Sequence, residues 1–290
     1  MADEARGSAR EDASSRHSVW RRLGGHRLAV AGGVIVLVVA TLALVLPAVI
    51  ATDPTALDVQ ETLSAPSRRH WFGTDDFGRD LFARVVHGIR LSLLVGSSVL
   101  AVTALLGAAP GLVAGFVPRA DAVIMRVMDA LMAFPAILLA LSVMAIAGPS
   151  TVNVVAALGV AYAPRMARLA RASVLAVRSR EFVDAARALG NRPLRVLARH
   201  VTPNAAAPVI VQGTFTVGYA ILGEAALSFV GLGAVPPTPS LGNILADARV
   251  FLRDAPWMIL CPAATLALLM LGLNLLGDGI RDALDPRTRI

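Results

Sequence analysis

The chain has 290 residues, of which 56% are hydrophobic and 16% charged, and its mean hydropathy is +0.67. An average soluble domain carries about 25% charged residues, so this composition favours a membrane protein. All 27 basic residues are arginine, which excludes a P-loop, because that motif needs a lysine to reach the nucleotide phosphates. With one cysteine, Cys261, and five scattered histidines, neither a disulfide, a metal site nor another cofactor is expected.

Long uncharged runs predict an all-α, polytopic membrane protein with six transmembrane helices. A spanning helix needs about 20 apolar residues, whereas a cleaved signal peptide has an apolar core of only about 7–15. The first run follows a polar tail at residues 1–27 and is long enough to be a retained helix. The uncharged run 130–164 is too long for one helix, and Gly148-Pro149-Ser150-Thr151 divides it. The predicted spans are 28–50, 91–117, 123–147, 152–172, 201–228 and 255–277.

The polar segment before the second span contains a separate helical pattern. Thr74 or Asp75 can cap a helix there, and an apolar stripe follows. This pattern predicts an interfacial helix lying on the outer leaflet, with two roles open: simple anchoring, or part of a platform for a substrate-binding protein. The stripe consists of Leu81, Phe82, Val85, Val86 and Ile89.

The distribution of arginine sets the orientation. With both termini in the cytoplasm, 20 of the 27 arginines lie on the inner side of the predicted bundle. This is the asymmetry that the positive-inside rule describes. The net charge of +7 therefore indicates contact with membrane lipid and requires no nucleic acid.

A cytoplasmic segment at 173–200 joins the fourth and fifth spans. Phe182, Ala185, Ala186 and Leu189 follow at i, i+3, i+4 and i+7, on one face of a predicted helix that Gly190 can end. From the residues alone, two interpretations are open. The helix docks into a groove on a partner protein, or it lies on anionic lipid of the inner leaflet.

Two acids near the membrane need an explanation. Glu224 interrupts an apolar run, and a charge at the bilayer centre costs about 2.5–3.5 kcal/mol on insertion scales, so Glu224 is expected to line a translocation path or hydrogen-bond a loop. Asp129 is expected to pair with Arg126 at i, i+3 near the inner surface.

Several blocks in the right order resemble the dipeptide, oligopeptide and nickel family of ABC-importer permeases. Asp184-Ala185-Ala186, Gly190 and the later Pro203 are similar to the family's EAA loop. Asp184 stands where the family often has Glu, and Thr202 where it often has an aliphatic residue. The likeness covers roughly residues 28–287, and its other blocks are 72–82, 125–135, 224–243 and 274–286.

This resemblance implies the type I ABC-importer permease architecture, in a bacterial cell membrane, with a permease domain at 28–287 and a short end at 288–290. It implies a second permease of dipeptide type, assembled with a homologous permease, two ATP-binding subunits and an extracytoplasmic substrate-binding protein. No residue would be catalytic. The expected cargo is dipeptides or oligopeptides, and the alternative is nickel, haem or another small solute. The residues implied in coupling to the ATPase are Phe182, Asp184, Ala185, Ala186, Leu189 and Gly190.

Two rival classes make different demands on the sequence. An ion-driven secondary transporter favours ionisable residues deep in its helices and an internal inverted repeat. Only Glu224 and Asp129 approach the first condition, and no repeat is apparent. A membrane-embedded enzyme needs paired acids, histidine clusters or a nucleophile with its base inside the spans, and the sequence offers none of these.

Overall fold

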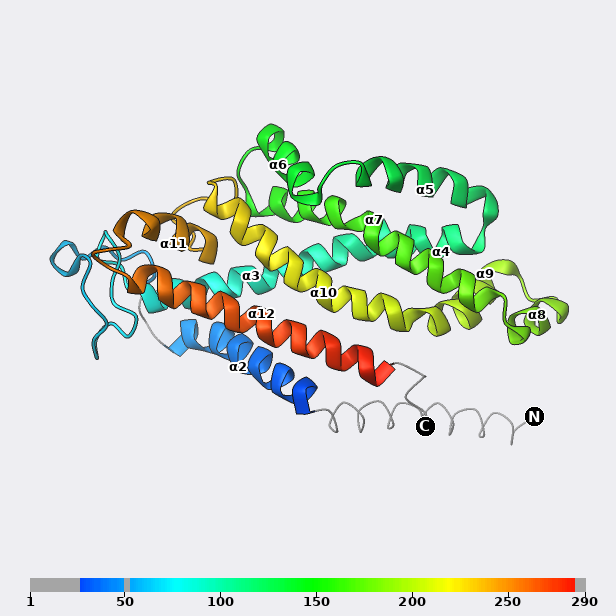
Figure 1. Ribbon diagram of the computed structural model, residues 1–290, viewed down its shortest axis with the longest axis horizontal. Helices are drawn as coiled ribbons and strands as arrows, with labels where there is room; N and C mark the ends of the chain where they lie inside the picture. The colour runs from blue at the N-terminus through cyan, green and yellow to red at the C-terminus, as the bar shows by residue number, and fades with distance from the viewer. Residues whose placement is uncertain (1–26, 50–52, 285–290) are drawn as a thin grey trace.

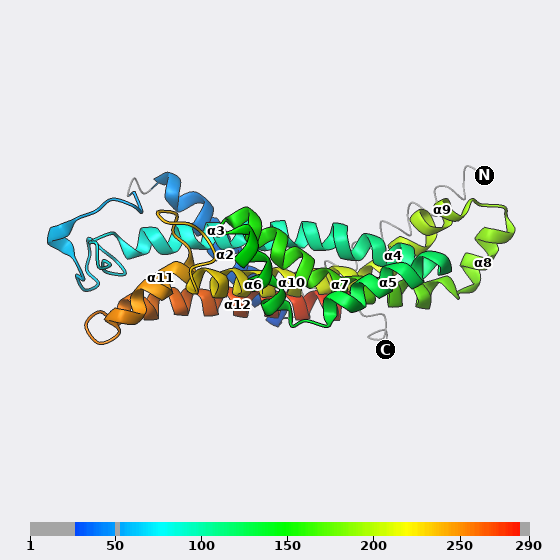
Figure 2. The same cartoon turned by 90° about the horizontal axis from the view of Figure 1, so that it is seen from above.

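The computed structural model describes residues 27–49 and 53–284, and every regular element in that part is a helix. Long helices run side by side along one axis, with the segment 53–80 at one end and α8 at the other (Figure 1; Figure 2). The helices are α2 (Arg27–Val49), α3 (Leu81–Thr103), α4 (Ala109–Phe116), α5 (Pro118–Met132), α6 (Ala136–Ala147), α7 (Thr151–Arg178), α8 (Glu181–Ala188), α9 (Pro193–Val196), α10 (Thr202–Phe229), α11 (Leu241–Ala248) and α12 (Trp257–Leu284).

Four helical segments are long and apolar enough to cross a membrane: 27–47, 81–116, 193–229 and 257–284. The pair α5 and α6 forms a fifth candidate, bent by 84° at its break. The remaining long helix, α7, has 28 residues and packs against α3, α4, α6 and α10, but its arginines lower its hydropathy. The predicted all-α membrane fold is therefore confirmed.

The second span begins at Leu81, ten residues before the predicted start, so the predicted interfacial helix is wrong. Its apolar stripe faces other helices: Leu81, Val85 and Ile89 are buried in a core shared with α2, α10, α11 and α12. The predicted cap is wrong as well. Asp80 caps the helix, and its carboxylate accepts a hydrogen bond of 2.8 Å from the Ala83 N–H.

The predicted third span is broken into α5 and α6 at residues 133–135. Pro135 has no N–H to continue the helical ladder, and a residue before proline avoids the helical region. The break predicted at Gly148 is confirmed. Gly148 has a φ of +80°, and the hydroxyl of Ser150 accepts from the Val152 N–H to cap α7.

Small residues bring α4 against α7. Gly107, just before α4, and Gly111 and Gly115 within it recur every four residues and face α7. A Cβ added at Gly107 would lie 2.5 Å from the carbonyl oxygen of Ala163, and one at Gly115 would lie 2.7 Å from the Cβ of Val174. Lipid provides no hydrophobic drive for helix association, so such close backbone packing holds these two helices together.

Candidate functional site

The helix α8 forms the far end of the molecule, beyond the ends of α4 and α7 (Figure 1). Glu181 lies in its first turn, where a carboxylate stabilises the helix dipole. Gly190 has a φ of +76°, and its N–H donates to the carbonyl oxygen of Arg187 at 2.9 Å. The predicted helix and its glycine stop are both confirmed, because few residues other than glycine adopt this backbone conformation readily.

The predicted apolar face of α8 is divided between the interior and the surface. Ala186 is 6% exposed and packs with Val183 in a core formed by the ends of α7 and α10. Phe182, Ala185 and Leu189 are exposed, with Leu189 at 83%. The structure therefore offers a narrower surface than the sequence indicated, and Ala186 supports it from inside. We call Phe182, Ala185 and Leu189 the α8 face.

Side-chain contacts also hold together the end of the bundle around α8. The side-chain amide of Asn191 donates to the carbonyl oxygen of Ala186 at 2.9 Å. Arg178, at the end of α7, donates to the carbonyl oxygen of Gly115 at 2.9 Å. The guanidinium of Arg187 lies 5.6 Å from the ring centroid of Phe116, while Asp184 remains exposed. The helix α8 therefore contacts α4 through Arg187 and α7 through the shared core.

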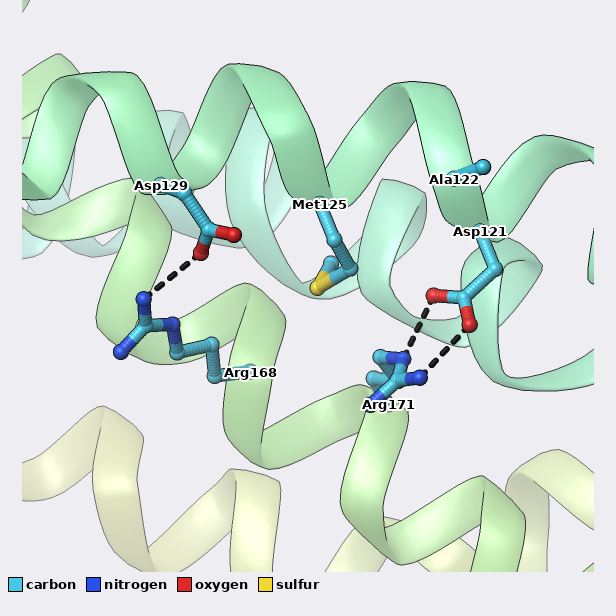
Figure 3. A pocket seen from close by; sticks show the side chains of 6 residues that line it. All are labelled: Asp121, Ala122, Met125, Asp129, Arg168 and Arg171. Carbon is cyan, nitrogen blue, oxygen red and sulfur yellow. Dashed lines mark hydrogen bonds and ion pairs between the residues drawn. The ribbon is translucent and has the colours of Figure 1, made fainter.

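A groove of about 480 Å³ between α5 and α7 carries two ion pairs (Figure 3). Asp121 accepts two hydrogen bonds from Arg171, at 2.5 and 2.6 Å, and Asp129 pairs with Arg168 at 2.6 Å. The predicted pair of Asp129 with Arg126 is wrong, because the arginine that reaches Asp129 belongs to another helix. Two charge pairs thus clamp α5 onto α7.

Glu224 is enclosed within the protein, with 1% of its surface exposed. Its carboxylate accepts a hydrogen bond of 2.6 Å from the Ser228 hydroxyl and one of 3.4 Å from Ser92. The Ser228 oxygen in turn accepts from the N–H of Ala234, in the loop between α10 and α11. Of the two roles expected for Glu224, holding a loop is the one with contacts in this conformation.

A second groove, of about 240 Å³, opens where α5 and α6 break. Tyr162 and Arg165 of α7 and Gln212 and Tyr219 of α10 lie along it. The Tyr162 hydroxyl donates to the carbonyl oxygen of Tyr219 at 3.1 Å, and the Arg165 guanidinium lies 5.5 Å from the Tyr219 ring centroid. The sequence analysis did not predict this groove, although Gln212 inside an uncharged run is a signal that could have indicated it.

Two known protein families match most of the chain. The family described as "Binding-protein-dependent transport system inner membrane component" matches residues 99–290, and "N-terminal TM domain of oligopeptide transport permease C" matches residues 14–66. The chain belongs to this family of inner-membrane transport components. It is therefore an integral membrane permease subunit of an ABC importer, which works with another permease, ATPase subunits and a binding protein. ATP is hydrolysed by the separate ATPase subunits.

Individual relatives match along most of the chain. A putative peptide transport system permease of Brucella abortus is 46% identical, covering 93% of this chain and 91% of its own length. The dipeptide transport system permease protein DppC of Alkalihalophilus pseudofirmus is 41% identical, covering 100% and 97%. An inward-facing structure of the MetNI methionine ABC transporter matches with a TM-score of 0.60 at 18% identity, covering 71% of this chain and 98% of that chain. This structural match confirms the predicted type I importer fold.

Proposed function

We propose that this chain forms half of the translocation path of an importer for dipeptides or oligopeptides and receives its motion from ATPase subunits through α8. The observation that carries the coupling role is the α8 face, an exposed apolar surface at the end of the bundle. Asp184 and Gly190 flank this face and complete the proposed docking surface. The peptide cargo is supported by the relatives, whose names describe peptide and dipeptide permeases.

The proposed assembly has one homologous permease as a partner, two ATP-binding subunits and an extracytoplasmic substrate-binding protein. In it, this chain is the second permease of a dipeptide-type system, with a permease domain at 28–287. The match to permease C over residues 14–66 supports that position. The segment 53–80 and α11, at the end opposite α8, are the surfaces available to the binding protein (Figure 1).

The proposed orientation places α8 in the cytoplasm. The described start of α2 and the described end of α12 both point toward the α8 end of the bundle (Figure 1). Both chain termini are therefore assigned to the cytoplasm, in agreement with the predicted excess of arginine on that side. The residues at 1–26 and 285–290 lie outside the described structure.

In the proposed mechanism, ATP binding closes the partner ATPases and displaces α8. The buried side chains of Val183 and Ala186 carry the displacement into the ends of α7 and α10. The hydrogen bond from Arg178 to Gly115 carries it into α4. The bundle then tilts against its partner permease and opens the path to the other side, which is alternating access.

The experiment that tests coupling is Leu189→Asp, in the complex purified with its ATPase subunits. A charge on this 83% exposed side chain should reduce ATPase co-purification by roughly tenfold or more, because apolar anchors dominate interface energies. The matched control for ATPase co-purification is Val59→Asp, which is 82% exposed at the opposite end. Peptide-stimulated hydrolysis is not compared in this control, because the segment 53–80 is proposed to face the binding protein. Normal ATPase binding and normal peptide-stimulated hydrolysis in Leu189→Asp would rule out the α8 face as the docking surface.

A further inference from the structure

The groove at the break between α5 and α6 has a composition that differs from a lipid-facing surface. Its walls combine apolar side chains from the break with polar side chains from α7 and α10. A run of residues from Met132 to Pro135 is exposed at the break. Irregular backbone within a membrane is tolerated only where protein covers it or a water-filled cavity adjoins it. In the proposed assembly, the groove therefore faces the partner permease and the path between the two subunits.

Arg165 is the charged residue of this groove. It continues a row of three arginines on α7, spaced by three residues, of which Arg168 and Arg171 are paired with Asp129 and Asp121. Among residues 27–49 and 53–284, Arg165 has no carboxylate within 4 Å, and its contact is the ring of Tyr219. Its guanidinium is exposed, with hydrogen-bond donors available to a ligand.

The depth of Arg165 in the membrane bears on the function of its unpaired charge. It follows Thr151, the first residue of α7, by 14 positions, or about 21 Å of helix. In the proposed orientation α7 crosses the bilayer from Thr151, and about 21 Å is less than the ~30 Å thickness of the hydrocarbon core, which places Arg165 inside it. Charged side chains at such depth face a partner or a water-filled path and mark substrate routes.

The other groove residues favour an anion with an apolar body. No acid is among the lining residues of this groove. The helix α6 begins at Ala136, itself a lining residue, so the positive end of that helix dipole adjoins the groove. Tyr162, Tyr219, Met132 and Phe134 supply aromatic and apolar surface. The volume of 240 Å³ is below the ~300–1,000 Å³ of typical ligand sites, as expected for half of a site.

We propose that this groove is the half-site that receives the C-terminal carboxylate of a peptide during its passage, with Arg165 as the carboxylate-binding residue. The inference rests on the proposed function, because the peptide cargo supplies the carboxylate. Arginine binds a carboxylate through two parallel hydrogen bonds, and the side chain next to that carboxylate lies against the tyrosines. The second permease closes the other wall of the site.

The test compares a dipeptide with its C-terminal amide in vesicles that contain the whole importer. Each peptide is supplied at a concentration that saturates the isolated binding protein, so that differences arise in the membrane. Arg165→Gln should lower the uptake of the free acid about tenfold, the factor expected for loss of a hydrogen bond to a charged group, and leave the amide nearly unchanged. Arg165→Lys should restore part of the loss.

The matched control is Arg126→Gln, an exposed arginine on α5 that does not line the groove. It should change the uptake of neither peptide. An equal loss of acid and amide in Arg165→Gln, or no loss at all, would overturn the carboxylate site. Loss of co-purified second permease in Arg165→Gln would also overturn it, because the arginine would then pair with an acid of that subunit.

Two further outcomes separate the inference from its premises. If the effect of Arg165→Gln appears only in vesicles rich in anionic lipid, a lipid phosphate is the ligand and the peptide site is overturned. If the wild-type importer moves neither the acid nor the amide, the proposed peptide function fails as well. Peptide uptake that is equal for acid and amide in wild type and variant leaves the function standing and removes only the site.

Discussion

The two ends of the bundle differ in how their side chains are held. At the end that the proposed orientation places outside, called the outer end, the carboxylate of Asp75 is buried. It accepts hydrogen bonds from the N–H groups of Phe77 and Arg79, both at 2.9 Å, and from the guanidinium groups of Arg79 and Arg84. Arg84 also faces Asp247 of α11 at 3.6 Å. At the opposite end, called the inner end, α8 keeps Phe182 and Leu189 exposed.

The difference shows where this chain depends on others. The segment 53–80 holds the buried Asp75 carboxylate with partners from this chain alone, although it also exposes apolar side chains such as Val59 and Trp71. The inner end is held by a small core and leaves apolar surface in water. An exposed apolar patch on an otherwise satisfied protein marks an interaction surface. We therefore expect mutations at the outer end to act on stability and mutations on the α8 face to act on assembly.

The largest effect on stability is expected from Asp75→Ala. This change leaves the buried Arg84 guanidinium without its main partner, and breaking a buried ion pair costs roughly 3–5 kcal/mol. Thermal unfolding of the purified complex measures the loss. The control is Asp53→Ala, in an exposed turn with Thr55, which should stay within about 0.5 kcal/mol of wild type. Similar stability of the two variants would refute the idea that the outer end is self-sufficient.

A medium effect is expected from Ala186→Phe, compared with Ala185→Phe. Ala186 faces the small core beneath α8. A larger side chain there should overpack this core and destabilise the end of the bundle by about 1–3 kcal/mol. Ala185 belongs to the exposed α8 face, so the same change there should leave thermal stability intact while weakening ATPase binding. Proteolysis of the segment 179–192 would distinguish them. If both variants resist cleavage equally, the division of the α8 surface is wrong.

The smallest effect is expected from Asp76→Asn. Burial, together with the neighbouring charge of Asp75, raises the pKa of Asp76 above its usual value of 3.8. The folded state therefore holds this proton more tightly than the unfolded state, and ionisation above the folded pKa destabilises the fold. Asp76→Asn should slightly raise the unfolding temperature at neutral pH, with the gain fading as pH falls through the raised pKa of folded Asp76 and absent below the usual value of 3.8. A gain that is independent of pH would contradict this origin.

The sequence predicted the features that depend on local pattern. Uncharged length located α2, α10 and α12, and Gly148 and Gly190 marked real chain breaks. The prediction from sequence failed where contacts with helices distant in the chain determine the structure. The stripe from Leu81 to Ile89 is apolar whether it faces lipid or α12, and the partner of Asp129 lies 39 residues further along, on α7.

The candidate site shows the same limit. The spacing correctly predicted an amphipathic helix with Phe182, Ala185, Ala186 and Leu189 on one face. In the structure, however, Ala186 is buried together with Val183, while the other three residues are exposed. Spacing fixes which residues share a face, and only packing against α7 and α10 decides how far that face turns inward. The Arg165 groove depends on three separate segments, so no single stretch of sequence could define it.

The glycine contact between α4 and α7 has a mechanical consequence. With Gly107, Gly111 and Gly115 seated against the α7 backbone, the two helices have little freedom to slide past one another, and together they behave as one stiff strut. Arg178 and Arg165 lie on this strut about 20 Å apart along α7. In the proposed mechanism, a displacement of α8 would be transmitted along this strut toward Arg165. Larger residues at these glycines would separate α4 from α7 and uncouple ATP hydrolysis in the partner subunits from peptide transport.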